Sequence, residues 1–256
     1  MENYPPYTIT DKMLNYVSDI MKKIGEANYF ESLNRYPELR RKTRIRSIHS
    51  SLAIENNQLS LFQVEDVING KMVIGEQKDI QEVKNAYKAY EQIDKMNPYS
   101  VEDLKRIHGI LTFLIEKNSG KFRNHGEAVY DGDVEIFMAP PHKMVPKLMD
   151  NLFNWMIENK DKVNPLILSS VFHYEFVFIH PFGDGNGRVG RMIMFKECLR
   201  NNIMPFIVLD NDKPYYMRGL KNYKEDKMFL IDTIRYEQDL YENIVNEMLD
   251  FDLGDK

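Results

Sequence analysis

Helical periodicity runs through most of this 256-residue chain and is the feature that most limits its fold. Apolar residues recur at steps of three and four, which places them on one buried face of an α-helix. One such stripe near the N-terminus ends at Gly25, a residue type that commonly stops helices. Its members are Leu14, Val17, Ile20, Met21 and Ile24. At about 12 residues per helix, the pattern predicts some eight to ten helices.

Local signals give several of the helix boundaries. Asn56-Asn57 indicates a helix stop, and Ser60 with Gln63 forms a capping box that starts the next helix. Helices are expected over about 38–55, 78–95 and 101–116, and then from Pro146 to Leu253 with loops near Pro165, 180–187 and 205–214.

The periodicity breaks between Gly120 and Pro141. Two short extended runs, 127–130 and 134–138, are joined by Asp131-Gly132-Asp133, a connection typical of a β-hairpin. The predicted fold class is therefore all-α with one short β-hairpin.

The chain shows no linker rich in Ser, Gly or Pro and no internal repeat. Its length is less than twice the roughly 150 residues of an average domain. We therefore expect one packed domain, in which an N-terminal helical region (1–95) joins a core with C-terminal helices (96–256).

Composition excludes several classes of protein. The 34 Lys+Arg and 39 Asp+Glu residues give a net charge of −5, so the basic field of a nucleic-acid binder is missing. Cys198 is the single cysteine and cannot form an internal disulfide. No apolar run reaches the roughly 18 to 20 residues of a membrane span, and the first residues lack the features of a signal peptide. We expect a cytoplasmic protein without direct contacts to membrane or nucleic acid.

The segment from Phe178 to Arg191 is far from average. It contains three glycines in five positions, Gly183, Gly185 and Gly187, directly before a predicted helix. Glycines let successive N–H groups converge on an anion, and the positive end of the helix dipole lies at the same place. The loop is therefore a predicted phosphate site.

Four charged or titratable side chains support this prediction. Arg188 and Arg191 lie three residues apart on one helix face and can bind phosphate oxygens. Asp184 would repel phosphates unless it holds a Mg²⁺ ion that bridges to them. His180 is the side chain suited to accept a proton near neutral pH.

The residues of this region allow two other interpretations. Gly185-x-Gly187-x-x-Gly190 also matches a dinucleotide-binding fingerprint, with 175–179 as the preceding strand and Asp210 as the ribose ligand. That would make the chain an oxidoreductase, but no further βαβ unit is predicted. His173 could pair with His180 on a metal, yet no third ligand has suitable spacing, so His173 is expected in the core or behind the site. The remaining histidines carry no particular signal: His49, His108, His125 and His142.

The segment from His180 to Arg191 resembles the signature of the Fic family, His-Pro-Phe-x-Asp/Glu-Gly-Asn-Gly-Arg-x-x-Arg, in full. The resemblance covers about 100–240 and includes Gly120-Lys-Phe-Arg123 and Trp155. Fic proteins of this signature are helical and transfer AMP from ATP to a Ser, Thr or Tyr hydroxyl of a target protein. The resemblance therefore implies an AMP-transferring enzyme that uses ATP and Mg²⁺.

The resemblance also implies roles for individual residues. His180 would deprotonate the target hydroxyl, Asp184 would bind Mg²⁺, and Phe182 would anchor the loop. The phosphate ligands would be Asn186 with the N–H groups of Gly185 and Gly187 at the α-phosphate, and Arg188 with Arg191 at the β- and γ-phosphates. The hairpin at about 127–138 would be a flap that holds a segment of the target by strand pairing. Tyr215 and Tyr216 resemble the segment that cradles adenosine.

A second resemblance concerns the helix expected at about 40–56. Ser51-Leu-Ala-Ile-Glu55-Asn56 matches the inhibitory motif Ser/Thr-x-x-x-Glu-Gly/Asn of Fic proteins that silence themselves. In that class the glutamate pairs with the second arginine of the signature, here Arg191. In some relatives the same glutamate helps to remove AMP, so the reverse reaction stays open.

The sequence leaves other questions open. A nucleotide-binding regulatory module with little turnover is the main alternative to an enzyme. The identity of the target, self-modification and homo-oligomer formation are likewise undecided.

Overall fold

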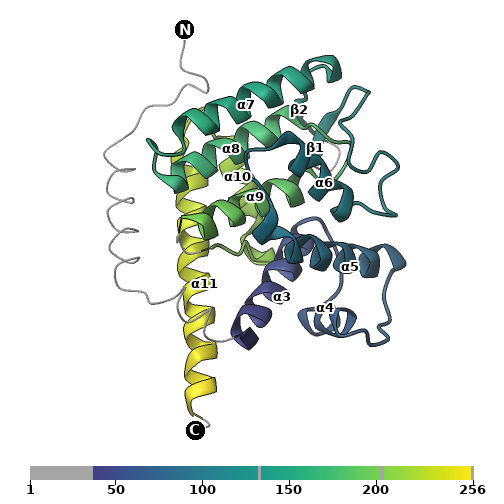
Figure 1. The fold of residues 1–256 in the computed structure, drawn as a ribbon, viewed down its shortest axis with the longest axis vertical. Helices are drawn as coiled ribbons and strands as arrows, with labels where there is room; N and C mark the ends of the chain where they lie inside the picture. Colours follow the sequence, from purple (N-terminus) through teal and green to yellow (C-terminus); the bar gives the residue numbers. More distant parts are fainter. Residues whose placement is uncertain (1–36, 132–133, 202–204, 255–256) are drawn as a thin grey trace. The chain divides into compact units, whose positions relative to one another are not determined.

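The computed structural model describes residues 37–131, 134–201 and 205–254. These residues form helices and one antiparallel pair of strands (Figure 1), so the predicted fold class is confirmed. The helix expected around Leu14–Ile24 lies outside the described residues.

The described chain divides into two compact units. One consists of Lys84–Glu197, and the other of residues 37–83 together with 198–254. This division differs from the expected boundary near residue 95, and packing as a single domain stays a prediction. Helices α5 (Gln77–Glu91) and α9 (Asn186–Arg200) each continue from one unit into the other.

The first unit is built around α8 (Pro165–Ile179), which is buried on nearly all sides. A helix that is apolar all round belongs in a core, and α7 (Val145–Asn159) packs along it. The other elements of this unit, in chain order, are η1 (Ile93–Lys95), α6 (Val101–Leu111), β1 (Ala128–Asp131), β2 (Val134–Met138) and η2 (His142–Met144).

The hairpin forms where the sequence predicts it. β1 and β2 pair antiparallel with Ala128 opposite Met138, and the register is irregular between Val129 and Tyr130. The backbone N–H of Ala139 donates to Glu127 O at 2.9 Å and closes the base of the hairpin.

The second unit contains helices from both ends of the described chain. Its elements are α3 (Pro37–Ile54), α4 (Leu61–Ile68), η3 (Asp210–Asp212), α10 (Lys213–Lys221) and α11 (Met228–Gly254). The capping box predicted at Ser60 and Gln63 is present at the start of α4. The stop predicted at Asn56 is also present, because Asn56 adopts a left-handed conformation with φ of 67°.

Two helices end earlier than the sequence predicts. The helix expected over 101–116 ends at Leu111, where Asn85 Nδ2 donates to the carbonyl oxygens of Leu111 and Phe113, and Leu114 then takes a positive φ of 61°. The helix expected over 78–95 ends at Glu91, before the short η1 turn.

The strand required by the dinucleotide alternative is absent. Residues 175–179 are the last turns of α8, so the glycine-rich loop follows a helix. Within the described ranges, the strands are those of the hairpin. The interpretation of this segment as a dinucleotide-binding fingerprint, which requires that strand, is therefore wrong.

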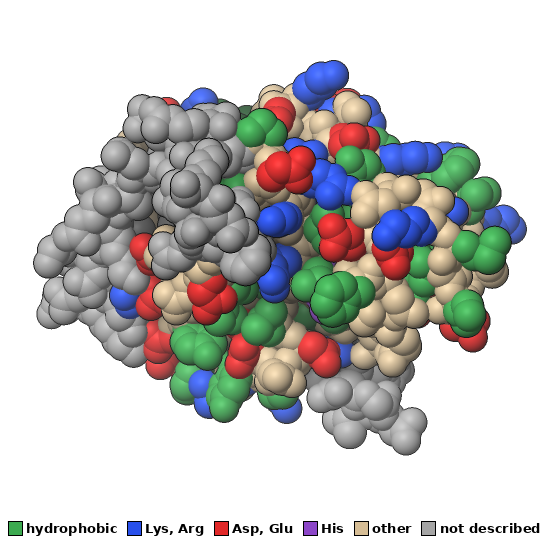
Figure 2. Space-filling model, turned by 90° about the horizontal axis from the view of Figure 1, so that it is seen from below, with side chains coloured by type: hydrophobic (Ala, Val, Ile, Leu, Met, Phe, Trp, Pro, Cys, Tyr) green, Lys and Arg blue, Asp and Glu red, His purple; other side chains and the backbone are tan. Residues whose placement is uncertain are grey.

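The surface agrees with the mixed charge of the sequence. Figure 2 shows acidic and basic side chains interspersed over the described part of one face. Among the described helices, none is both long and apolar enough to cross a bilayer.

Candidate active site

His180 follows the last residue of α8 and ends that helix. It adopts a left-handed conformation (φ 49°, ψ 61°), and its N–H donates to Phe176 O at 3.0 Å. A non-glycine residue in this region costs about 1 to 3 kcal/mol, so the surroundings must hold it there. Its Nδ1 lies 3.3 Å from Val177 O, which favours a proton on Nδ1 and leaves Nε2 as the basic nitrogen.

Phe182 and Asn186 fix the shape of the loop. Phe182 is fully buried and stacks on the ring of His108, with centroids 3.7 Å apart and planes 5° apart. Asn186 Nδ2 donates to Phe182 O at 2.8 Å, and Asn186 Oδ1 accepts from Phe182 N at 3.0 Å. The amide of Asn186 therefore closes the loop into a ring at the N-terminus of α9.

The glycines of the loop are not equivalent. Gly185 has φ of +78°, and a Cβ there would lie 2.9 Å from Thr112 Cγ2, so both conformation and space require glycine. A Cβ at Gly183 would meet nothing closer than 3.7 Å. Of these two positions, Gly185 is constrained by its surroundings and Gly183 is not.

His108 in α6 holds the loop, although the sequence around it carries no particular signal of such a role. Its Nε2 lies 3.0 Å from Asp184 O, and its Nδ1 accepts from Gly120 N at 2.9 Å. Burial lowers the pKa of His108 to about 4, so the ring is neutral and donates from Nε2. Its place on the buried face of the predicted helix over 101–116 was visible in the sequence, but its partner 76 residues away was not.

The structure brings Asp184 and Arg188 together. Arg188 Nη2 lies 3.0 Å from Asp184 Oδ2, and Gly185 N donates to Asp184 Oδ1 at 2.6 Å. The side chain of Arg188 is 3% exposed, whereas the side chain of Asp184 is 43% exposed. One face of the carboxylate is thus held in the loop while part of it reaches solvent.

Asp184 is suited to hold the Mg²⁺ ion that the family resemblance implies, provided that a bound substrate supplies further ligands. Within the described part of the chain, no three His, Cys, Asp or Glu side chains form a metal-binding group. Mg²⁺ in phosphate sites is commonly held by one or two carboxylates, water and phosphate oxygens. A single exposed carboxylate suits that arrangement.

His173 lies in α8 and Arg191 lies in α9, the two helices that the loop connects. Arg191 is 5% exposed, and His173 is fully buried, as expected for a core residue. Burial, with a smaller effect of Arg191, lowers the pKa of His173 to about 3. A Cβ at Gly190 would lie 2.7 Å from His173 Nδ1, so glycine permits the close approach of α9 to α8.

The other predicted site residues belong to the second unit. Ser51 lies in the last turn of α3, and Glu55 and Asn56 follow its end. Lys213 Nζ donates to Asn56 Oδ1 at 2.8 Å. In α10, Tyr216 is buried and Tyr215 is 55% exposed. The residues from His180 to Arg191 all belong to the first unit, so the pairing of Glu55 with Arg191 stays a prediction.

Known sequences resemble this chain over the same region. The Fic/DOC family model matches residues 98–198. The chain is 26% identical over 182 residues to "Protein adenylyltransferase Fic" of Nematostella vectensis, covering 68% of this chain and 42% of that protein. It is 25% identical over 209 residues to a probable protein adenylyltransferase of Aquifex aeolicus, covering 78% and 61% respectively. The chain thus spans less than two thirds of the length of either relative.

Solved structures extend the likeness to nearly the whole chain. Fic-1 of C. elegans, at 22% identity, has the same fold, with a TM-score of 0.78 over 93% of this chain and 72% of that chain. A Fic family protein of Desulfovibrio desulfuricans G20 is 38% identical, with a TM-score of 0.83, and the match covers 97% of this chain and 77% of that one. The chain therefore belongs to the Fic family.

Proposed function

We propose that this chain transfers AMP from ATP to a Ser, Thr or Tyr hydroxyl of a target protein. The observation that carries the proposal is the loop between α8 and α9, in which His180, Asp184 and the N-terminus of α9 are held together within one unit. The names of the curated relatives, protein adenylyltransferases, point the same way.

In the proposed reaction the target hydroxyl oxygen bonds to the α-phosphorus of ATP. The bond from that phosphorus to the oxygen bridging to the β-phosphate breaks, and pyrophosphate leaves. His180 Nε2 takes the hydroxyl proton. It is the unprotonated nitrogen of the tautomer that Val177 O favours. His180 is partly exposed, so an incoming hydroxyl can reach its imidazole.

The phosphates are assigned to groups of the loop and of α9. With ATP bound, the N–H of Gly185, which donates to Asp184 Oδ1 in this structure, would turn to the α-phosphate. The N–H of Gly187 and the second N–H of Asn186 Nδ2 would bind the same phosphate. Arg188 and Arg191 would bind the β- and γ-phosphates. Asp184 would hold Mg²⁺, which when bound neutralises phosphate charge.

Regulation is part of the proposal. Glu55 would pair with Arg191 in the resting state and keep that guanidinium from the γ-phosphate. The αL conformation of Asn56 and the capped start of α4 support a helix end of the kind the inhibitory motif requires. A misplaced triphosphate would slow transfer without closing the site.

The donor and the metal can be tested together. The Glu55→Gly protein is incubated with a cell lysate and with ATP, GTP or UTP labelled on the α-phosphate, with and without Mg²⁺. We expect protein labelling from ATP that requires Mg²⁺. Asp184→Ala should lose this labelling, and calorimetry should show that it also loses tight ATP binding. Labelling that is unchanged in Asp184→Ala would mean that Asp184 only shapes the loop.

A further inference from the structure

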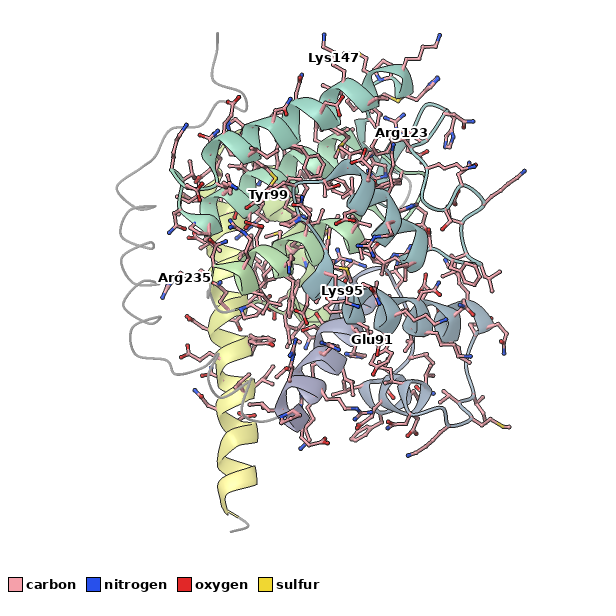
Figure 3. All side chains as sticks on the ribbon, viewed as in Figure 1. Glu91, Lys95, Tyr99, Arg123, Lys147 and Arg235 are labelled. Carbon is pink, nitrogen blue, oxygen red and sulfur yellow. The ribbon has the colours of Figure 1, made fainter. Side chains whose placement is uncertain are left out.

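Arg123 is a buried arginine that no proposed catalytic step uses. It lies in the connection between α6 and β1 (Figure 3). Its side chain is buried, and the residue is 3% exposed. A buried guanidinium needs hydrogen-bond acceptors for its five N–H groups. The hydrogen bonds recorded for this side chain all go to backbone carbonyl oxygens: those of His125, Pro140, Ile179 and His180.

Part of this residue holds the end of α8. Arg123 Nε donates to His180 O at 2.7 Å, and Nη2 lies 3.3 Å from Ile179 O. The backbone N–H of Arg123 donates to Pro181 O at 2.9 Å. The last carbonyls of a helix lack partners within the helix and carry its negative partial charge, so a cation is favourable there. One residue thus fixes three successive carbonyls around the left-handed His180.

The rest of the guanidinium holds both ends of the hairpin. Nη1 donates to His125 O at 2.7 Å, and Nη2 also donates to Pro140 O. His125 precedes β1 and Pro140 follows β2. The ring of Phe137 in β2 lies 6.4 Å from the imidazole of His180 and stacks on Phe178 at 5.5 Å. The hairpin and His180 therefore share Arg123 as a common support.

We propose that Arg123 is a positioning residue that locks the hairpin to His180 and so sets where a bound target hydroxyl meets the imidazole. This inference rests on the proposed function, because it assigns the hairpin to target binding. An error of about 1 Å in such an alignment can lower the rate by about a hundredfold. Lysine has the charge of Arg123 but not its fork of five donors, so it can hold only some of the carbonyls.

The first test measures how firmly Arg123 holds the hairpin and the His180 loop, and it does not depend on enzymatic activity. Amide hydrogen exchange is followed in the full chain for wild type, Arg123→Lys, Arg123→Met and the control Arg106→Met, whose arginine makes a surface ion pair with Asp103 at 3.1 Å. We expect amides in 124–131, 134–140 and 180–187 to exchange at least about tenfold faster together in Arg123→Met, and less so in Arg123→Lys. Amides of α7 and the whole Arg106→Met control should exchange as in wild type.

Faster exchange in one of the two segments alone, in neither, or equally throughout the unit would overturn the inference. Circular dichroism checks folding, and if Arg123→Met does not fold, Arg123→Lys decides by the same criteria.

The second test measures transfer in the more active of two backgrounds, wild type and Glu55→Gly. Arg123→Met should lower protein labelling from α-labelled ATP at least about thirtyfold while binding of a non-hydrolysable ATP analogue changes less than about threefold. Arg106→Met should transfer normally. If the background itself transfers no AMP, the proposed function fails and hydrogen exchange alone judges Arg123. If exchange rises but labelling does not fall, the positioning role is wrong.

Discussion

His180 and Asn56 are both non-glycine residues in the left-handed region, with φ of 49° and 67°, yet their surroundings differ. Asn56 is exposed at the end of α3, and asparagine tolerates this conformation well. His180 is a less suitable residue type, and its carbonyl is held by the buried Arg123. At Asn56 the residue type is enough to explain the left-handed conformation at the end of a helix. At His180 the conformation is held by Arg123, which also binds both ends of the hairpin. A strained residue that is held in this way indicates a functional site.

The largest effect is expected from His180→Ala. Loss of the general base should lower AMP transfer by at least about a hundredfold, because proton removal from the hydroxyl is no longer assisted. ATP affinity should change only a few-fold, since the base acts on the incoming hydroxyl. Labelling rates and calorimetry measure the two quantities. Full labelling by His180→Ala would contradict the mechanism.

The next effect compares two glycines of the same loop. Gly185→Ala should lower transfer about a hundredfold, because the new Cβ meets Thr112 and the positive φ is strained. Gly183→Ala is the matched control and should keep transfer within about threefold, since its Cβ has room. Equal rates in the two variants would mean that the loop geometry does not limit the reaction.

A smaller effect, of opposite sign, is expected at the end of α3. Glu55→Gly should raise labelling at least about tenfold, because Arg191 becomes available to the γ-phosphate. Arg191→Ala should be inactive with either residue at position 55. Asn56→Gly should leave labelling near the wild-type level, because glycine also adopts the left-handed conformation. No increase in Glu55→Gly under saturating ATP and Mg²⁺ would make the Ser51–Asn56 segment an ordinary helix end.

The last comparison concerns stability, and the two units should respond to pH in opposite directions. In the first unit, the folded-state pKa values of His108 and His173 lie below the ordinary value of 6.5, at about 4 and about 3. The unfolded chain then binds protons that the folded chain does not, so unfolding free energy is lost as pH falls below about 6.5. In the second unit, burial raises the pKa of Glu237 to about 8. The folded chain keeps a proton there that the unfolded chain releases, so unfolding free energy is lost as pH rises from about 4.5 to about 8.

Urea unfolding of two variants separates these effects. Glu237→Gln should remove the loss at higher pH and raise the unfolding free energy near pH 8 by roughly 2 to 4 kcal/mol. His108→Gln should make the decline below about pH 6.5 shallower. A Glu237→Gln protein with an unchanged pH profile would contradict the raised pKa.

Much of the fold was predictable because the signals for it are local. The capping box at Ser60, the stop at Asn56 and the hairpin all lie where short segments of sequence indicate them. The end of α6 at Leu111 was not predictable, because it depends on hydrogen bonds from Asn85, a residue distant in sequence.

The site shows the same division. The glycine-rich loop, its charged residues and the helix that follows them were visible as a motif. The roles of His108 and Arg123 depend on carbonyl oxygens 76 and 57 residues away along the chain. Side chains that bind backbone leave no motif at their partners, so sequence patterns alone do not reveal them.

The central claim is that the loop transfers the AMP part of ATP, and the position of the label tests it most directly. Glu55→Gly is incubated with Mg²⁺, a cell lysate and ATP labelled on either the α- or the γ-phosphate, beside His180→Ala in the same background. The account predicts that protein retains label from the α-phosphate, that the γ-label leaves with pyrophosphate, and that mass spectrometry finds AMP on a Ser, Thr or Tyr side chain. Protein that retains the γ-label, or α-labelling that persists without His180, would contradict it.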